Sequence, residues 1–232
     1  MRRSVCFLFF SLFVLICLSA QSNACESAYM PFVKGVSFEL TTYSQKGKKT
    51  GSVSHDIAEV SDLATGYRAT VYTQLSDDKG KPTTDGRYTI DCTSDGIVVD
   101  VSSLLNSQTM AAFSAMEVDV TGDGLQIPNT LTPGQTLPDA SLHMKASMNG
   151  LTLIQLNMQI TNRKVIGKEK ITTPAGAFDC VKLAQTTSLD GFGKSTYEST
   201  TWLARGVGTV RTENYDKKGE LGSYSELTVF KK

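Results

Sequence analysis

The sequence predicts a mainly β protein: a single curved antiparallel sheet, a half-barrel or open barrel, of about 11–12 strands with one short helix. Apolar and polar residues alternate over runs of about five to ten residues, which is the period of a half-buried strand. Short segments rich in glycine, lysine and aspartate separate these runs. Neighbouring strands therefore pair antiparallel, and a sheet of this size either curls or closes.

The N-terminus predicts an export signal. Two arginines precede an apolar run, Val5 to Leu18, that is shorter than the roughly 18–20 residues of a membrane-spanning helix. Small residues allow cleavage after Ala20 or after Ala24. We expect residues 1–24 to be a signal peptide and residues 25–232 one β half-barrel domain, monomeric, without a transmembrane segment, in the periplasm or at the cell surface.

A lipid anchor is an alternative to simple cleavage, because Cys25 directly follows small residues. The lipid-attachment motif requires an aliphatic residue three positions before the cysteine, and Ser22 stands there. The sequence thus favours cleavage without lipidation.

Charge argues against several partners. Removing Arg2 and Arg3 from 23 basic residues leaves 21 against 23 acidic residues, a net charge of −2. A nearly neutral chain has no field that attracts nucleic acid or anionic membranes. We therefore expect no nucleic-acid partner.

Three cysteines, Cys25, Cys92 and Cys180, lie outside the signal. In an exported protein one disulfide and one free thiol are an option, and three pairings are open. All three cysteines could equally remain small buried apolar groups.

The first half of the domain contains five predicted strands. They are Val36–Ser44, Ser52–Val60, Tyr67–Leu75, Arg87–Cys92 and Ile97–Val101, the last two joined by a Ser94–Gly96 turn.

A change of period follows. Leu105, Thr109, Ala112 and Phe113 have helical spacing, which predicts a short helix over Ser102–Ala115. A short strand over Met116–Thr121 comes next.

Three prolines interrupt the pattern between Ile127 and Asp139. Proline fixes φ and donates no backbone hydrogen bond, so we expect a loop without regular pairing. It is either a domain linker or a strap that closes one end of a barrel. The strap fits better, because the strand pattern is the same on both sides.

The strongest hairpin signal is Asn149–Gly150, between the alternating runs Ala140–Met148 and Leu151–Ile160. Asn-Gly suits a type I′ turn, in which both residues have positive φ. The apolar phase switches in the second run, which predicts a β-bulge near Leu153.

A second hairpin occupies Asn162–Leu183, with its turn at Pro174–Gly176 and its return strand beginning at Ala177. Three further strands complete the sheet: Thr196–Ala204, Thr209–Tyr215 and Leu221–Phe230. Three lysine-rich turns, Gln45–Lys48, Asp78–Lys81 and Lys217–Glu220, are typical of solvated strand ends.

Catalytic and metal-binding patterns are not evident in the sequence. Neither His55 nor His143 has a second metal ligand at a suitable spacing. Glu117, Asp119 and Asp123 form a loose acidic group that does not match a calcium-binding loop. We expect no metal, no cofactor and no enzymatic activity.

Soft apolar residues gather in the middle third of the chain. Methionine adapts to irregular surfaces, so this stretch favours a concave face for an apolar ligand, although an ordinary core would show the same pattern. The candidate ligand-binding residues are Leu142, Met144, Met148, Leu156, Met158 and Trp202.

Two segments, Asn162–Cys180 and Trp202–Arg211, resemble the signature of the TapB-like exported bacterial proteins, as do Met30–Gly35 and the C-terminus. That family has no agreed function, and its general form is similar to the LolA and LolB half-barrels. The resemblance implies an envelope location and supplies no catalytic residues. The signature residues themselves look structural: Pro174, Gly176, Phe178, Gly206 and Gly208.

The expected function is thus a non-enzymatic exported binding or carrier domain for an apolar ligand or protein segment. The alternative is a structural subunit of an envelope complex that holds no small ligand.

Overall fold

The computed structural model describes residues 24–100, 116–191 and 193–232, which form thirteen strands and one 3-10 helix, η1 (Ala24–Ser27). The strands are β1 (Ser37–Ser44), β2 (Lys49–Leu63), β3 (Gly66–Asp77), β4 (Pro82–Thr93), β5 (Gly96–Val99), β6 (Glu117–Thr121), β7 (Leu125–Pro128), β8 (Ala140–Met148), β9 (Leu151–Thr173), β10 (Gly176–Asp190), β11 (Lys194–Ala204), β12 (Gly208–Tyr215) and β13 (Leu221–Lys231).

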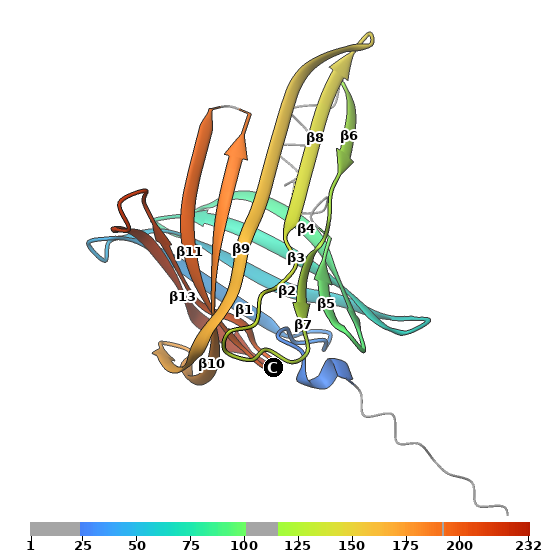
Figure 1. The fold of residues 1–232 in the computed structure, drawn as a ribbon. Helices are drawn as coiled ribbons and strands as arrows, with labels where there is room; N and C mark the ends of the chain where they lie inside the picture. The colour runs from blue at the N-terminus through green and yellow to red at the C-terminus, as the bar shows by residue number, and fades with distance from the viewer. Residues whose placement is uncertain (1–23, 101–115, 192) are drawn as a thin grey trace, which may run out of the picture.

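All thirteen strands belong to one antiparallel sheet, in the order β6-β8-β9-β10-β11-β12-β13-β1-β2-β3-β4-β5-β7. The two edge strands, β6 and β7, are consecutive in the chain and only Gly122–Gly124 separates them. A sheet whose edges are joined by so short a connection must bend back toward itself. Figure 1 shows β6, β8 and β9 rising steeply while β2, β3 and β4 run across behind them. The predicted fold class, a curved antiparallel open sheet, is confirmed.

The strand count differs from the prediction of about 11–12. The added strand is β7, which takes its last two residues from the segment predicted as a loop. The two runs predicted on either side of Asn162 are one 23-residue strand, β9. Asn162 has a φ of 54°, and the register with β10 shifts beside it, so the strand bends there without ending. Residues 1–23 of the predicted signal over 1–24, and the predicted helix over 102–115, lie outside the described residues.

The proline-rich segment pairs more than the sequence predicts. Ile127 and Pro128 extend β7, which pairs with β5. Further on, Thr136 forms an isolated bridge with Lys164 on β9. The expectation of a loop without regular pairing is therefore wrong at these points, because the free edges of β5 and β9 offer hydrogen-bond partners within reach.

The segment from Asn129 to Asp139 acts as the predicted strap, and one buried arginine fastens it. Arg163 on β9 has no exposed surface. Its guanidinium donates to Pro138 O at 2.6 Å and to Gln126 O at 2.9 Å. It thereby ties the strap and β7 to β9 where the two ends of the sheet approach each other. Burial lowers the pKa of this guanidinium to about 10, and Asp139 opposes that shift.

The main core combines residues of the strands with residues of two segments outside the sheet. The strap contributes buried Leu131 and Leu137, and the segment after η1 contributes buried Ala28, Tyr29 and Met30. Strand residues supply the remainder of this core, including Phe38, Ile57, Val71, Ile90, Val165, Leu183, Leu203, Val210 and Leu227. The core therefore depends on chain segments outside the sheet as well as on the strands.

One predicted turn is confirmed, and the second is one residue shorter than predicted, because Gly176 already belongs to β10. Asn149 and Gly150 have φ angles of 53° and 78°, as a type I′ turn requires. At the second hairpin Thr173 pairs with Gly176, and Gly176 has a φ of 135°. Its turn also contacts a distant strand, since the Ala175 amide donates to Leu227 O at 3.4 Å.

Candidate functional site

Four of the six candidate ligand-binding residues come together on β8 and β9. Leu142 pairs with Met158, and Met144 pairs with Leu156. Directly opposed residues point to the same face of a sheet, as do residues two apart in one strand. Leu142 and Met144 are buried, whereas Leu156 and Met158 are half-buried.

Strand β6 widens this group. Val120 pairs with Met144, and Val118 pairs with Ala146. Met144 and Ala146 are the buried centre of a second apolar cluster, separate from the main core. We define the apolar face as Val118, Val120, Leu142, Met144, Ala146, Ile154, Leu156 and Met158.

A bulge carries the apolar face outward along β9. Ala146 pairs with Ile154 and Ser147 pairs with Thr152, so Leu153 has no partner on β8. This confirms the bulge that the phase switch predicts. Beyond it Met148 pairs with Leu151, so these two side chains share the face of Met144.

Met148 is the fifth candidate, and it lies at the outer end of this stripe with 38% of its surface exposed. Its position is continuous with Met144 and Ala146 along β8. It therefore belongs to the same face but at the tip of the hairpin.

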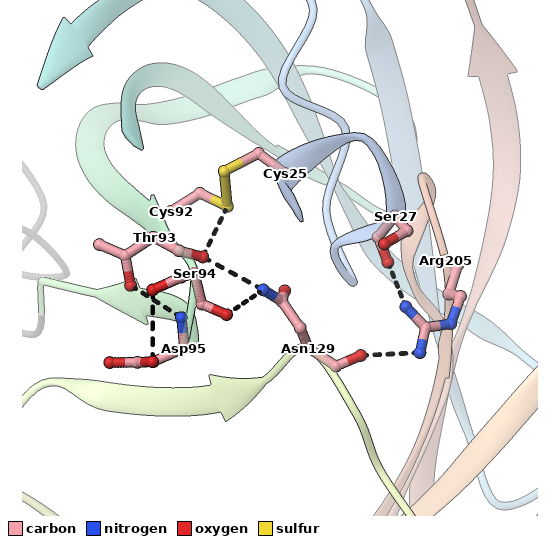
Figure 2. Close-up of a disulfide and its surroundings, with 8 residues drawn as sticks. All are labelled: Cys25, Ser27, Cys92, Thr93, Ser94, Asp95, Asn129 and Arg205. Carbon is pink, nitrogen blue, oxygen red and sulfur yellow. Dashed lines mark hydrogen bonds between the residues drawn. A yellow bond between two sulfur atoms is a disulfide. The ribbon is translucent and has the colours of Figure 1, made fainter. Parts of the chain in front are cut away.

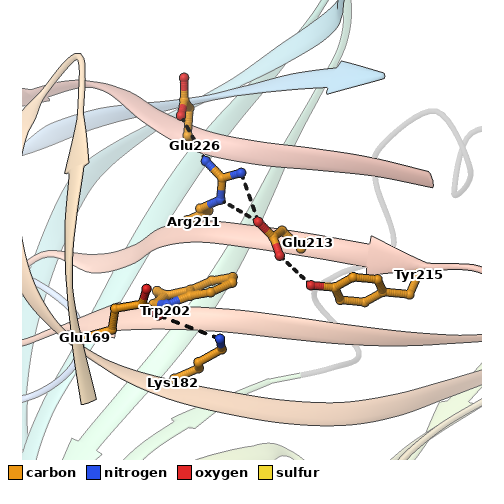
Figure 3. A network of polar contacts seen from close by, with 7 residues as sticks. All are labelled: Glu169, Lys182, Trp202, Arg211, Glu213, Tyr215 and Glu226. Carbon is orange, nitrogen blue, oxygen red and sulfur yellow. Dashed lines mark hydrogen bonds and ion pairs between the residues drawn. The ribbon is translucent and has the colours of Figure 1, made fainter. Parts of the chain in front are cut away.

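Trp202, the sixth candidate, lies elsewhere. It pairs with Lys182 on β10 and belongs to the main core, as do Cys180 and Ala204, which alternate to the same face of these strands. It is 4% exposed and its indole N–H donates to Glu169 Oε2 at 2.9 Å. Lys182 Nζ lies 4.7 Å from its ring centre, and Figure 3 shows this group. The structure thus gives Trp202 a packing role apart from the apolar face.

Figure 3 also shows a polar network on β12 and β13. Arg211 contacts Glu213 at 2.9 Å and Glu226 at 3.4 Å, and it lies over the Tyr224 ring. Tyr215 donates to Glu213. Burial, reinforced by Glu213, raises the pKa of Tyr215 to about 12. Each charge here faces an opposite charge, so the network fixes the pairing of neighbouring strands.

The disulfide joins Cys25 and Cys92, which leaves Cys180 as a buried free thiol. Of the three pairings that the sequence leaves open, this one links the N-terminal segment to β4 (Figure 2). The Cys25 sulfur is bonded to Cys92, so it cannot at the same time carry a thioether-linked lipid. Burial is the main cause that raises the pKa of Cys180 to about 11.

Arg205 holds the same N-terminal segment against the strap, as Figure 2 shows. Its guanidinium donates to Ser27 O at 2.6 Å and to Asn129 O at 2.7 Å. Asn129 in turn donates to the carbonyls of Thr93 and Ser94. The N-terminus, the strap and the end of β4 are thus linked by hydrogen bonds around the disulfide.

A groove of about 810 Å³ lies beside this junction. Its lining combines buried apolar residues, among them Leu131, Val181 and Val207, with charged residues at Lys168, Glu169, Lys170, Asp179 and Arg205. Both segments that carry the family resemblance contribute to it. The sequence therefore marked these two segments, but sequence reasoning did not identify the groove. The turn-forming and aromatic residues in the segments indicated only a structural role.

The histidines are engaged in local contacts. His55 stacks on Phe38 with ring centres 4.6 Å apart, and its Nδ1 lies 3.2 Å from the Tyr88 hydroxyl. Burial lowers the pKa of His55 to about 4. His143 Nδ1 lies 2.8 Å from Asn157 Oδ1. Within the described ranges no three His, Cys, Asp or Glu side chains gather as metal ligands.

The structural-motif residues occupy the places that their chemistry requires. Gly206 lies within the β11–β12 turn and Gly208 begins β12, with φ angles of 65° and 99°. Phe178 packs half-buried against the main core. In the part of the chain with described coordinates, no helix is long and apolar enough to cross a membrane.

Two solved structures share this fold. A candidate exported protein with a YmcC-like fold from Bacteroides fragilis is 23% identical, with a TM-score of 0.72 over 89% of this chain and 100% of its own. A candidate lipoprotein from Parabacteroides distasonis is 27% identical, with a TM-score of 0.71 over 88% of this chain and 99% of its own. Among curated proteins none matches.

The family assignment comes from the sequence as a whole. Residues 33–227 match the DUF3108-like family. The match does not carry the narrower TapB-like name. The description as an exported protein comes from the Bacteroides fragilis structure. Because the family match spans most of the chain, this protein belongs to the DUF3108-like family.

Proposed function

We propose that this protein is a non-enzymatic binding or carrier domain of the bacterial cell envelope that holds an apolar ligand on its apolar face. The observation that carries the proposal is the second apolar cluster, which lies on β6, β8 and β9 apart from the main core. It joins buried and half-buried apolar residues of three adjacent strands into one continuous apolar surface. The exported and lipoprotein relatives support the envelope location.

The chemistry of the face fits an acyl chain or a similar flexible apolar group. Its half-buried members are Val118, Val120, Ile154, Leu156 and Met158. Of these, Leu156 and Met158 are unbranched at Cβ and lie two residues apart on one strand. Methionine tolerates ligands of variable shape. No charged residue belongs to the face, so we expect selection by apolar area with little electrostatic steering.

The first test is native mass spectrometry of the protein isolated from its own envelope fraction under mild conditions. We expect a reproducible added mass that organic solvent releases and that is identified as a lipid. A bare protein mass, together with a cross-linked envelope partner, would instead support the alternative of a structural subunit without a small ligand.

The second test assigns the site. We expect Leu156→Asp with Met158→Asp to weaken binding of a fluorescent fatty acid at least about tenfold, since each buried Leu or Met side chain contributes roughly 1.5–3 kcal/mol. Gln155→Asp with Gln159→Asp is the matched control, because it adds the same charges to exposed positions on the other face of β9.

The groove near the disulfide is the competing site. Ala177→Arg places a long cationic side chain at an exposed position of its lining. Loss of fatty-acid binding in this variant, with normal binding in the Leu156 and Met158 variant, would move the site to the groove.

A further inference from the structure

The outer half of the β8–β9 hairpin carries no charge. Residues 146–162 are 17 consecutive uncharged residues in a chain that is 20% charged. At the tip of this hairpin three large apolar side chains are exposed to solvent: Met148 at 38%, Leu151 at 69% and Leu153 at 55%. A group of exposed apolar side chains on a small domain marks a contact surface.

Three other hairpin tips of the same sheet carry lysine. Lys46 and Lys48 lie at the β1–β2 tip, Lys79 lies at the β3–β4 tip, and Lys217 and Lys218 lie at the β12–β13 tip. Lysine at such positions keeps a strand end in water and discourages association. The β8–β9 tip lacks this protection.

The tip is joined to the apolar face without a break. The bulge at Leu153 places Leu151 opposite Met148, on the same face as Met144. Without the bulge in β9, strict alternation along the strand would point Leu151 to the opposite face of the sheet from Leu156 and Met158. Exposed Leu151 and Met148 therefore lie at the open end of a stripe that leads inward to the buried part of the face.

We propose that this tip, Met148–Leu153, docks on the surface of a lipid bilayer. Figure 1 shows the hairpin extending beyond every other strand, so its end can reach a flat surface first. Within the tip Ser147 pairs with Thr152 and Met148 with Leu151, and Asn149–Gly150 closes the turn. Because this pairing covers only the inner edges of the two strands, the tip would rest in the hydrated headgroup layer with its apolar side chains directed at the acyl boundary.

The size of the tip favours a bilayer over a protein partner. A stable protein interface buries about 800 Å² on each partner, which is far more than three side chains at the end of a two-stranded ribbon can provide. The mature chain would have a net charge of −2, so apolar insertion, not charge, would drive docking. This inference rests on the proposed function for its purpose, since docking would bring the apolar face to the lipids from which an acyl chain could transfer.

The test is flotation of the full mature chain with neutral phosphatidylcholine vesicles. We expect the unaltered protein to float with the vesicles and Leu151→Asn with Leu153→Asn to reduce the bound fraction at least about tenfold. The matched control, Val33→Asn with Tyr72→Asn, removes two apolar side chains that are 61% and 50% exposed away from the tip, and it should float normally. All these positions are exposed, so the variants should fold, and thermal unfolding checks this.

A second readout locates the contact. An environment-sensitive fluorophore on Thr152→Cys should shift to the blue with vesicles, while the same fluorophore on Lys217→Cys should not. Cys180 is buried and the other two cysteines are bonded, so labelling is confined to the new thiol.

Two results would overturn the docking proposal: no flotation of the unaltered protein, or equal flotation of the tip variant. Cross-linking of the tip to an envelope protein, without vesicle binding, would also overturn it and assign the tip to a protein partner. A lipid still found by native mass spectrometry in those cases would leave the proposed function standing. If the chain binds vesicles normally but is found to carry no ligand, the proposed carrier function is overturned and the docking proposal stands.

Discussion

The disulfide between Cys25 and Cys92 should be the largest single contribution to stability outside the core. It closes a loop over a sequence separation of 67 residues, which contains β1, β2 and β3. In the chain-entropy description, a loop of that length removes unfolded-state freedom equivalent to about 4 kcal/mol. Both cysteines are almost fully buried, so the bond also joins the N-terminal segment to the core.

The perturbation is Cys25→Ala with Cys92→Ala, and the assay is equilibrium unfolding in guanidinium chloride followed by tryptophan fluorescence. We expect a loss of about 4 kcal/mol, which for a domain of this size lowers Tm by roughly 8–16 °C. Cys180→Ala is the control, and its loss should stay near 1 kcal/mol because only a small buried thiol is removed. A double variant that loses less than about 1 kcal/mol would refute the reasoning.

Three further predictions concern buried groups. Arg163→Met should lower the free energy of unfolding by about 2–4 kcal/mol, because it leaves the Gln126 and Pro138 carbonyls without their donor. The control is Arg205→Met, which also removes an arginine from two carbonyls but at an exposed position, and it should lower the free energy of unfolding clearly less. Equal losses of the two variants in urea titrations would contradict the stabilising role of buried Arg163. The folded-state pKa of His55, about 4, lies below its unfolded value of 6.5, so its contribution is complete above pH 6.5 and is lost as pH falls toward 4. Between pH 7 and pH 5 this amounts to about 2 kcal/mol, which should be missing from the pH dependence of His55→Phe; identical pH profiles of the two proteins would exclude it. Cys180 should react with iodoacetamide at pH 8 only after unfolding, because burial raises its thiol pKa to about 11, and rapid labelling of the folded protein, measured by mass, would contradict that environment.

Much of the fold could be predicted because the informative signals are local. The Asn149–Gly150 turn requires positive φ at two successive residues, and few other dipeptides allow it. The bulge at Leu153 was readable because an extra residue reverses the apolar alternation. Strand β7 was missed, since it is four residues long and ends in a proline, and only the free edge of β5 made a strand of it.

The candidate site was predicted in part for the same reason. Leu142, Met144, Leu156 and Met158 share a face because one hairpin fixes their register. Trp202 lies on β11, which is separated from β9 by β10 in the sheet. The face that Trp202 occupies therefore depends on the register of each strand pair in between. No local pattern carries that information.

By itself the sequence determined the class of fold, the Asn149–Gly150 turn and the bulge at Leu153, since each of these depends on residues close together in the chain. The export signal stays a prediction. Only the tertiary structure decided which cysteines pair, which carbonyls the Arg163 guanidinium binds and which face of the sheet Trp202 occupies. Cys25 and Cys92 meet because β1, β2 and β3 are stacked between them in register, and Arg163 finds its carbonyls because the sheet bends until its two edges approach. These contacts join distant segments, so they exist only once the whole sheet has formed.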